Sequence, residues 1–211
     1  QVNLMPTVHK AINQFNVEKK NVADFILSTT KNIAPIINAL DGQLITEKSY
    51  EIPTVANGAY ISDQNRDILK IVVVNRYLDT APAIGFIKNI GIKDAAFAST
   101  VAHDSHNIMG VSTDDHLICD CVNAIIDSKG GLAFYSAYNK ATIPLPVAGL
   151  MSTASCEVIG KQYQKIDQLV KDAGCTLKSP FMTLSFMALL VIPKIKISDL
   201  GMFDAENFSF Y

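Results

Sequence analysis

The sequence has 211 residues, of which 49% are hydrophobic and 18% charged, with a mean hydropathy of +0.22 and a formal net charge of −2. This composition is typical of a folded protein with a substantial core and excludes a disordered chain. No cluster of Lys or Arg forms the basic stripe of a nucleic-acid binder, and the longest apolar run, 182–193, is too short to cross a bilayer. We therefore expect neither a nucleic acid nor a membrane as partner.

The cysteines and the first residue bear on the setting of the chain. Four cysteines at irregular spacing do not make a disulfide scaffold in a chain of this length, which favours a reduced, cytoplasmic location. The chain opens on Gln1 without a charged segment followed by an apolar one, so no secretory signal is expected. The same opening indicates a piece of a longer polypeptide.

The first third of the chain predicts one helix and several short strands. Helical spacing of apolar residues covers 2–15, and β-prone runs follow at 22–28, 33–38 and 43–50. Asp41-Gly42 and Asn57-Gly58 are turn pairs of the kind that joins antiparallel strands.

The middle of the chain predicts a buried strand at 68–74 that ends in Asn75 and Arg76, and two strands, 95–101 and 108–111, joined by a polar segment. A helix capped by Thr113 or Asp114 follows, and 132–135 predicts another strand. Pro144 and Pro146 cannot donate hydrogen bonds within a sheet, so 142–150 is expected at an edge or in an extended loop.

The last third contains the clearest helix, capped by Ser155 and ended by Gly174, with one apolar and one charged face. A buried run at 181–192 and a short strand with a turn at 195–201 complete the chain. Strands mixed with a few helices, without a regular βαβ rhythm, predict an α+β fold with a mixed or mainly antiparallel sheet and a few covering helices.

The segment between the two central strands is the densest chemistry in the chain: His103, Asp104, Ser105, His106 and Asn107. Such a segment is either a hydrogen-bonded turn or part of a functional pocket, because buried polar groups need partners. Asp104 could fix the tautomer of a neighbouring imidazole, leaving its other nitrogen for proton transfer or ligand contact.

Simpler catalytic templates do not fit this segment. The histidine pair lacks the glutamate of a helical zinc motif, and no nucleophile elbow surrounds Ser105. Asn75 and Arg76 are secondary candidates: the guanidinium of Arg76 suits a planar acceptor or carboxylate, or else it simply reaches solvent or pairs with a surface carboxylate.

Five segments, in the same order, resemble the C-terminal part of bacterial adenine deaminases, and the resemblance covers about 52–208. They are Val73-Val-Asn-Arg-Tyr77, Gly85-Phe-Ile-Lys-Asn-Ile-Gly91, Ala98-Ser-Thr-Val-Ala-His-Asp-Ser-His-Asn-Ile108, Pro144-Leu-Pro-Val-Ala-Gly-Leu-Met151 and Pro180-Phe-Met-Thr-Leu-Ser-Phe186. The resemblance divides the chain into an N-terminal segment, 1–51, of a helix plus short strands, and an α+β domain, 52–211, like the C-terminal domain of that family.

The resemblance implies a parent enzyme of the amidohydrolase superfamily that converts adenine and water to hypoxanthine and ammonia. In that superfamily a (β/α)-barrel holds the divalent metal, here expected to be manganese or iron, that activates the water. A barrel takes about 250 residues, more than this whole chain, so no catalytic residue, metal ligand or cofactor is expected within it.

The expected function is therefore that of a non-barrel domain that supports the active site and subunit assembly and is inactive alone. Its expected partners are the barrel of the same or a partner chain and further copies in a homo-oligomer. Residues 103–107 either help to shape the adenine pocket or only stabilise their turn. Two alternatives stay open: a stand-alone small-molecule-binding or oligomerisation module, and an independent metal-dependent hydrolase using His103 and His106.

Overall fold

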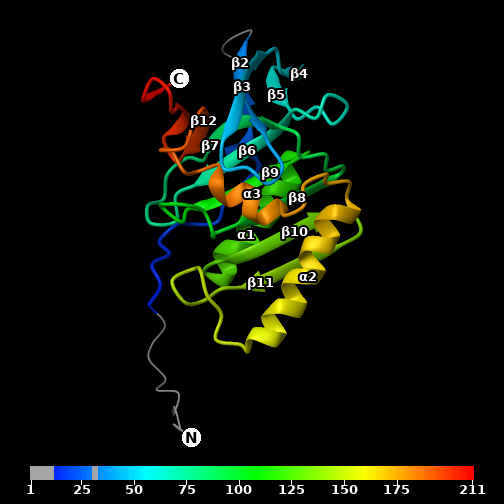
Figure 1. Cartoon of the computed structure of the whole chain (residues 1–211), viewed down its shortest axis with the longest axis vertical. Helices are drawn as coiled ribbons and strands as arrows, with labels where there is room; N and C mark the ends of the chain where they lie inside the picture. Colours follow the sequence, from blue (N-terminus) through cyan, green and yellow to red (C-terminus); the bar gives the residue numbers. More distant parts are fainter. Residues whose placement is uncertain (1–11, 30–32) are drawn as a thin grey trace, which may run out of the picture.

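The computed structural model describes residues 12–29 and 33–211, and a twisted eight-stranded sheet lies at the centre of this part of the chain (Figure 1). The strand order is β11-β10-β8-β9-β6-β7-β2-β3, and every neighbouring pair is antiparallel except β2 and β7. The strands of this sheet are β2 (Ala34–Ala39), β3 (Thr46–Glu51), β6 (Leu69–Val74), β7 (Ala83–Lys88), β8 (Ala95–Ser99), β9 (Ile108–Ser112), β10 (Gly131–Ser136) and β11 (Lys140–Pro144).

Helices and two small sheets complete the fold. The helical elements are η1 (Val22–Phe25, a 3-10 turn), α1 (Asp115–Ser128), α2 (Cys156–Asp172) and α3 (Pro180–Phe186). The small sheets are β1-β5-β4, from β1 (Leu27–Ser28), β4 (Thr54–Ala56) and β5 (Ala59–Ile61), and β12-β13-β14, from β12 (Ile195–Ser198), β13 (Gly201–Asp204) and β14 (Ser209–Phe210). The predicted α+β class with a mainly antiparallel mixed sheet is confirmed.

Both faces of the central sheet are covered, which explains why its middle strands are buried without alternation. Successive residues of β6 point to opposite faces: Val72 packs with α1, whereas Ile71 and Val73 pack in the core beneath α2 and α3. In Figure 1, α2 (yellow) and α3 (orange) lie in front of the sheet. The small sheet with β12 packs on the α2 and α3 face, through Ile195 and Ile197.

The predicted helix boundaries follow from capping groups. Asp114 is the N-cap of α1, where its Oδ1 accepts from the backbone N–H groups of His116 and Leu117 at 2.8 and 3.2 Å. Ser155 caps α2 in the same way through the N–H of Val158. The prediction of an edge or an extended loop at 142–150 is also confirmed, because β11 is the outermost strand of the sheet and ends at Pro144, and a loop follows it.

Two predictions for the N-terminal part of the chain are not confirmed. Residues 2–11 of the expected helix at 2–15 lie outside the described residues, and 12–15 are not helical. The strand predicted at 22–28 is wrong for most of its length: Asp24 accepts from the backbone N–H of Asn21 at 2.7 Å and closes a 3-10 turn that buries Phe25. β2 and β3 belong to the central sheet, and the boundary at residue 51 stays a prediction.

Candidate functional site

The polar candidates gather at one end of the central sheet, where β6 and β8 end and β9 begins. Val74 pairs with Ile108 and Ser99 with Met109, so Asn75, Arg76 and the segment 103–107 emerge together. We call the segment 103–107 the polar loop. The β-sheet register thus brings together all of the site residues predicted from the sequence.

The polar loop is anchored at both ends and exposed at its tip. The backbone N–H of His103 donates to the Ser185 carbonyl at 2.9 Å, and the His103 ring stacks on Phe186 with 5.0 Å between ring centroids. Asp104 and Ser105 are exposed, whereas Asn107 is buried and its Oδ1 accepts from the backbone N–H of Arg76 at 3.2 Å. The loop therefore combines a structural base with a solvent-facing tip.

The surroundings of His106 lower its pKa and so disfavour the protonated form. Burial lowers its pKa most, and the neighbouring His103 and Arg76 lower it further, while Asp104 opposes them. The centroids of the two imidazole rings lie 5.7 Å apart, and His106 Nδ1 is buried without a hydrogen-bond partner among the described residues. A half-buried histidine whose protonated form is disfavoured is better suited to hydrogen bonding than to binding an anion.

Arg76 is buried and acts as a structural clamp, because its guanidinium contacts three separate segments of the chain. Its guanidinium donates to the Ala148 carbonyl and to the Tyr77 hydroxyl, each at 2.8 Å, and stacks over the rings of Phe15 and Tyr77. A Cβ at Gly149 would clash with this guanidinium. Within the described part of the chain no carboxylate pairs with Arg76, so the surface ion pair considered for it is not present.

Asn75, which directly follows β6, binds a residue that the sequence did not single out. Its Oδ1 accepts from the backbone N–H groups of Tyr77 and Leu78, and its Nδ2 donates to Asp199 at 2.7 Å. Asp199 lies 124 positions away, at the turn between β12 and β13, in a stretch with no motif that could mark it. With Asp104 and Ser105, it lines a cavity of about 280 Å³.

A metal centre does not fit the described residues. Among them there is no group of three or more His, Cys, Asp or Glu side chains that could hold an ion. The four cysteines are free thiols, of which Cys119, Cys121 and Cys175 are buried. Burial raises the pKa of these three thiols, which keeps them protonated and poor as ligands or nucleophiles.

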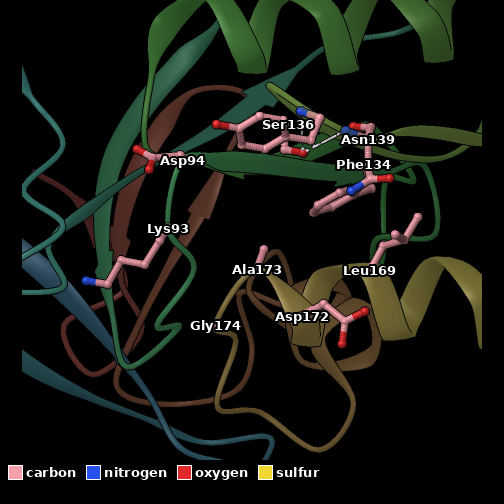
Figure 2. A pocket seen from close by; sticks show the side chains of 10 residues that line it. Lys93, Asp94, Phe134, Ser136, Asn139, Leu169, Asp172, Ala173 and Gly174 are labelled. Carbon is pink, nitrogen blue, oxygen red and sulfur yellow. Dashed lines mark hydrogen bonds between the residues drawn. The ribbon is translucent and has the colours of Figure 1, made fainter.

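A second cavity, of about 370 Å³, lies at the opposite end of β8, between the turn at 136–139 and the end of α2 (Figure 2). Each charged side chain that lines it forms a hydrogen bond within the protein. Lys93 donates to the Gln64 carbonyl, and Asp94 accepts from the Gln64 amide. Asp172 accepts from the Gln168 amide. Figure 2 shows Phe134 and Leu169 forming an apolar wall. These features describe an open surface hollow whose charged side chains already have hydrogen-bond partners.

Within 12–29 and 33–211, no helix has the length and apolar character needed to cross a membrane. The fold and the site define an α+β domain whose polar loops meet at one end of the sheet. Among the residues described, no group of side chains at this end of the sheet could hold a metal ion.

Known proteins place the chain in a family. A family model described as the adenine deaminase C-terminal domain matches residues 43–209, and the chain belongs to this family. Proteins named adenine deaminase are 42% identical over 212 residues in Borreliella burgdorferi, covering 99% of this chain, and 45% identical over 212 residues in Methanosarcina mazei, covering 95%. The match spans only 39% and 38% of those relatives, so this chain corresponds to well under half of their length.

Proposed function

We propose that this chain is the C-terminal, non-barrel part of a cytoplasmic adenine deaminase that converts adenine and water to hypoxanthine and ammonia. The observation that carries the proposal is the match of nearly the whole chain to less than two fifths of relatives that bear that name. In this proposal the domain completes and supports an active site formed mainly by the remaining part of the polypeptide, and does not deaminate adenine alone.

The divalent metal of the parent reaction, manganese or iron, belongs in this proposal to the barrel. The described residues offer no group that fits such an ion, so we assign no metal-dependent step to them. The barrel of the same chain or of a partner subunit, within a homo-oligomer, is the proposed partner of this domain.

The polar loop divides into two roles. Asn107 is buried and accepts from the Arg76 backbone, so its role is to hold the loop in place. His103, Asp104 and Ser105 are at least partly exposed and can reach a partner surface or the edge of an adenine pocket. This division makes opposite predictions for the two ends of the loop.

The first experiment compares the purified 211-residue chain with the full-length parent enzyme. Each is incubated with adenine and manganous or ferrous ion, and the loss of adenine absorbance is followed. We expect turnover from the full-length enzyme only. Turnover by the 211-residue chain, or inertness of a folded, metal-loaded full-length enzyme, contradicts the proposal.

The second experiment separates the two roles within the polar loop. In the full-length enzyme, His103→Ala is expected to lower kcat/KM with a smaller loss of melting temperature than Asn107→Ala, because only the ring stacking on Phe186 is lost and the backbone hydrogen bond of His103 to Ser185 is kept. Asn107→Ala removes the acceptor of a buried N–H and is expected to cost about 1–3 kcal/mol of stability. Equal loss of stability in both variants, with activity unaffected by His103→Ala, would assign the whole loop a structural role.

A further inference from the structure

The cavity between the polar loop and the C-terminal segment is bordered by apolar side chains that are left open to solvent. We propose that this surface is the docking site for the domain that precedes this one in the same polypeptide, an inference that rests on the proposed function. The docking face is defined by Leu78, Asp104, Val191, Asp199, Leu200 and Phe210.

Exposure of large apolar side chains marks this face. Val191 is 64% and Leu200 76% exposed, and both line the cavity together with Phe210. Leu78, 62% exposed, is linked to the same rim because Asn75 binds both its backbone and the Asp199 carboxylate. Apolar residues that surround a hollow and are not covered are typical of a surface that binds another protein segment.

The first described residues of the chain lie at this end of the sheet. The Ile12 carbonyl accepts from the Ala148 N–H at 2.7 Å, and Arg76 binds the Ala148 carbonyl beside it. Arg76 in turn binds the Tyr77 hydroxyl, which donates to the Ser105 carbonyl of the polar loop at 2.8 Å. Four successive hydrogen bonds thus connect Ile12, where the described chain begins, to Ser105 beside the docking face.

The charge of the face specifies the partner. Asp104 has neither a hydrogen bond nor an ion pair among the described residues, and Asp199 is bound only through the Asn75 amide. A complementary surface therefore carries apolar side chains that enter the cavity, bordered by Lys, Arg or amide donors that reach these two carboxylates.

The outer side of α2 does not have this character. Its exposed charges pair along the helix, as Lys161 does with Glu157 at 2.7 Å, with both side chains more than 70% exposed. Such a surface is solvated and serves as the reference face in the test.

Hydrogen–deuterium exchange tests the proposal by comparing the 211-residue chain with the full-length parent enzyme. We expect slower exchange in the full-length enzyme at 103–107, 188–191 and 198–200, and unchanged exchange along α2. Unchanged exchange in those three segments overturns the proposal. So does protection that disappears when an oligomer is diluted to monomers, because the occupant is then a second copy.

A matched pair of substitutions adds a functional readout. Leu200→Asp in the full-length enzyme is expected to restore fast exchange on the docking face and to lower kcat/KM about tenfold or more, because a displaced domain no longer supports the site. In the 211-residue chain the same change is expected to leave the melting temperature unchanged, since Leu200 is exposed. Val158→Asp, on the half-exposed first turn of α2, is the control and should leave exchange and kcat/KM unchanged.

The outcomes distinguish this inference from the proposed function. A full-length enzyme that deaminates adenine while the docking face exchanges freely retains the function and loses the docking face. A full-length protein whose docking face is protected but that does not act on adenine retains the docking face and loses the function.

Discussion

Replacing Arg76 with Met in the 211-residue chain tests whether this residue is a structural clamp. The change removes two short, charge-assisted hydrogen bonds, to Ala148 and Tyr77, each worth about 1.5–3 kcal/mol. It also removes two cation–π contacts, to Phe15 and Tyr77, worth about 0.5–1 kcal/mol each.

This loss of stability is partly offset. Burying a guanidinium without a carboxylate partner costs several kcal/mol of desolvation free energy, and a buried Met does not have this cost. We therefore expect the free energy of unfolding to fall by about 2 kcal/mol, which corresponds to a melting temperature roughly 4–8 °C lower for a chain of this size. Urea denaturation and thermal unfolding measure the loss directly.

The segments that become less stable are as informative as the size of the change in stability. Hydrogen exchange should accelerate in 12–17 and 146–150, the two segments that Arg76 joins. Lys19→Met, which removes an exposed ion pair with Asp127, is the control and should change the stability by less than about 0.5 kcal/mol. An unchanged melting temperature and unchanged exchange in Arg76→Met would refute the clamp and leave binding as the role of Arg76.

Two further predictions concern titration and a buried ion pair. Because the pKa of His106 is lowered in the fold, the unfolded chain binds the proton more readily, and stability falls as the pH drops through about 6.5. His106→Asn, which tolerates the positive φ of 54° at this position, should show a smaller drop in melting temperature between pH 7.5 and 5.5; an equal drop would place the titrating group elsewhere. Lys70→Met breaks the contacts of a 1% exposed ammonium with both Asp115 oxygens, at 2.7 and 2.8 Å, and should cost about 2–4 kcal/mol in urea denaturation. Adding Asp115→Leu should recover part of that loss, and a double variant less stable than Lys70→Met would contradict the assignment.

Local signals predicted most of the regular elements. The continuous apolar run of β6 and the capping residues Asp114 and Ser155 are features of neighbouring residues, and their physical effect does not depend on the rest of the fold. The turn at residues 22–25 shows the limit, because a β-prone run was overridden by one Asp side chain and by the burial of Phe25.

The sequence by itself determined the α+β class, the family and the cluster of polar residues at 103–107, because composition, periodicity and motif order are properties of the chain. Only the tertiary structure decided the roles within that cluster. The β-sheet register placed Arg76 among loops that bury it, and the β12–β13 turn brought Asp199 to Asn75 from 124 positions away. Burial and long-range hydrogen bonds depend on which strands pair, and pairing between distant segments is not encoded in the spacing of neighbouring residues.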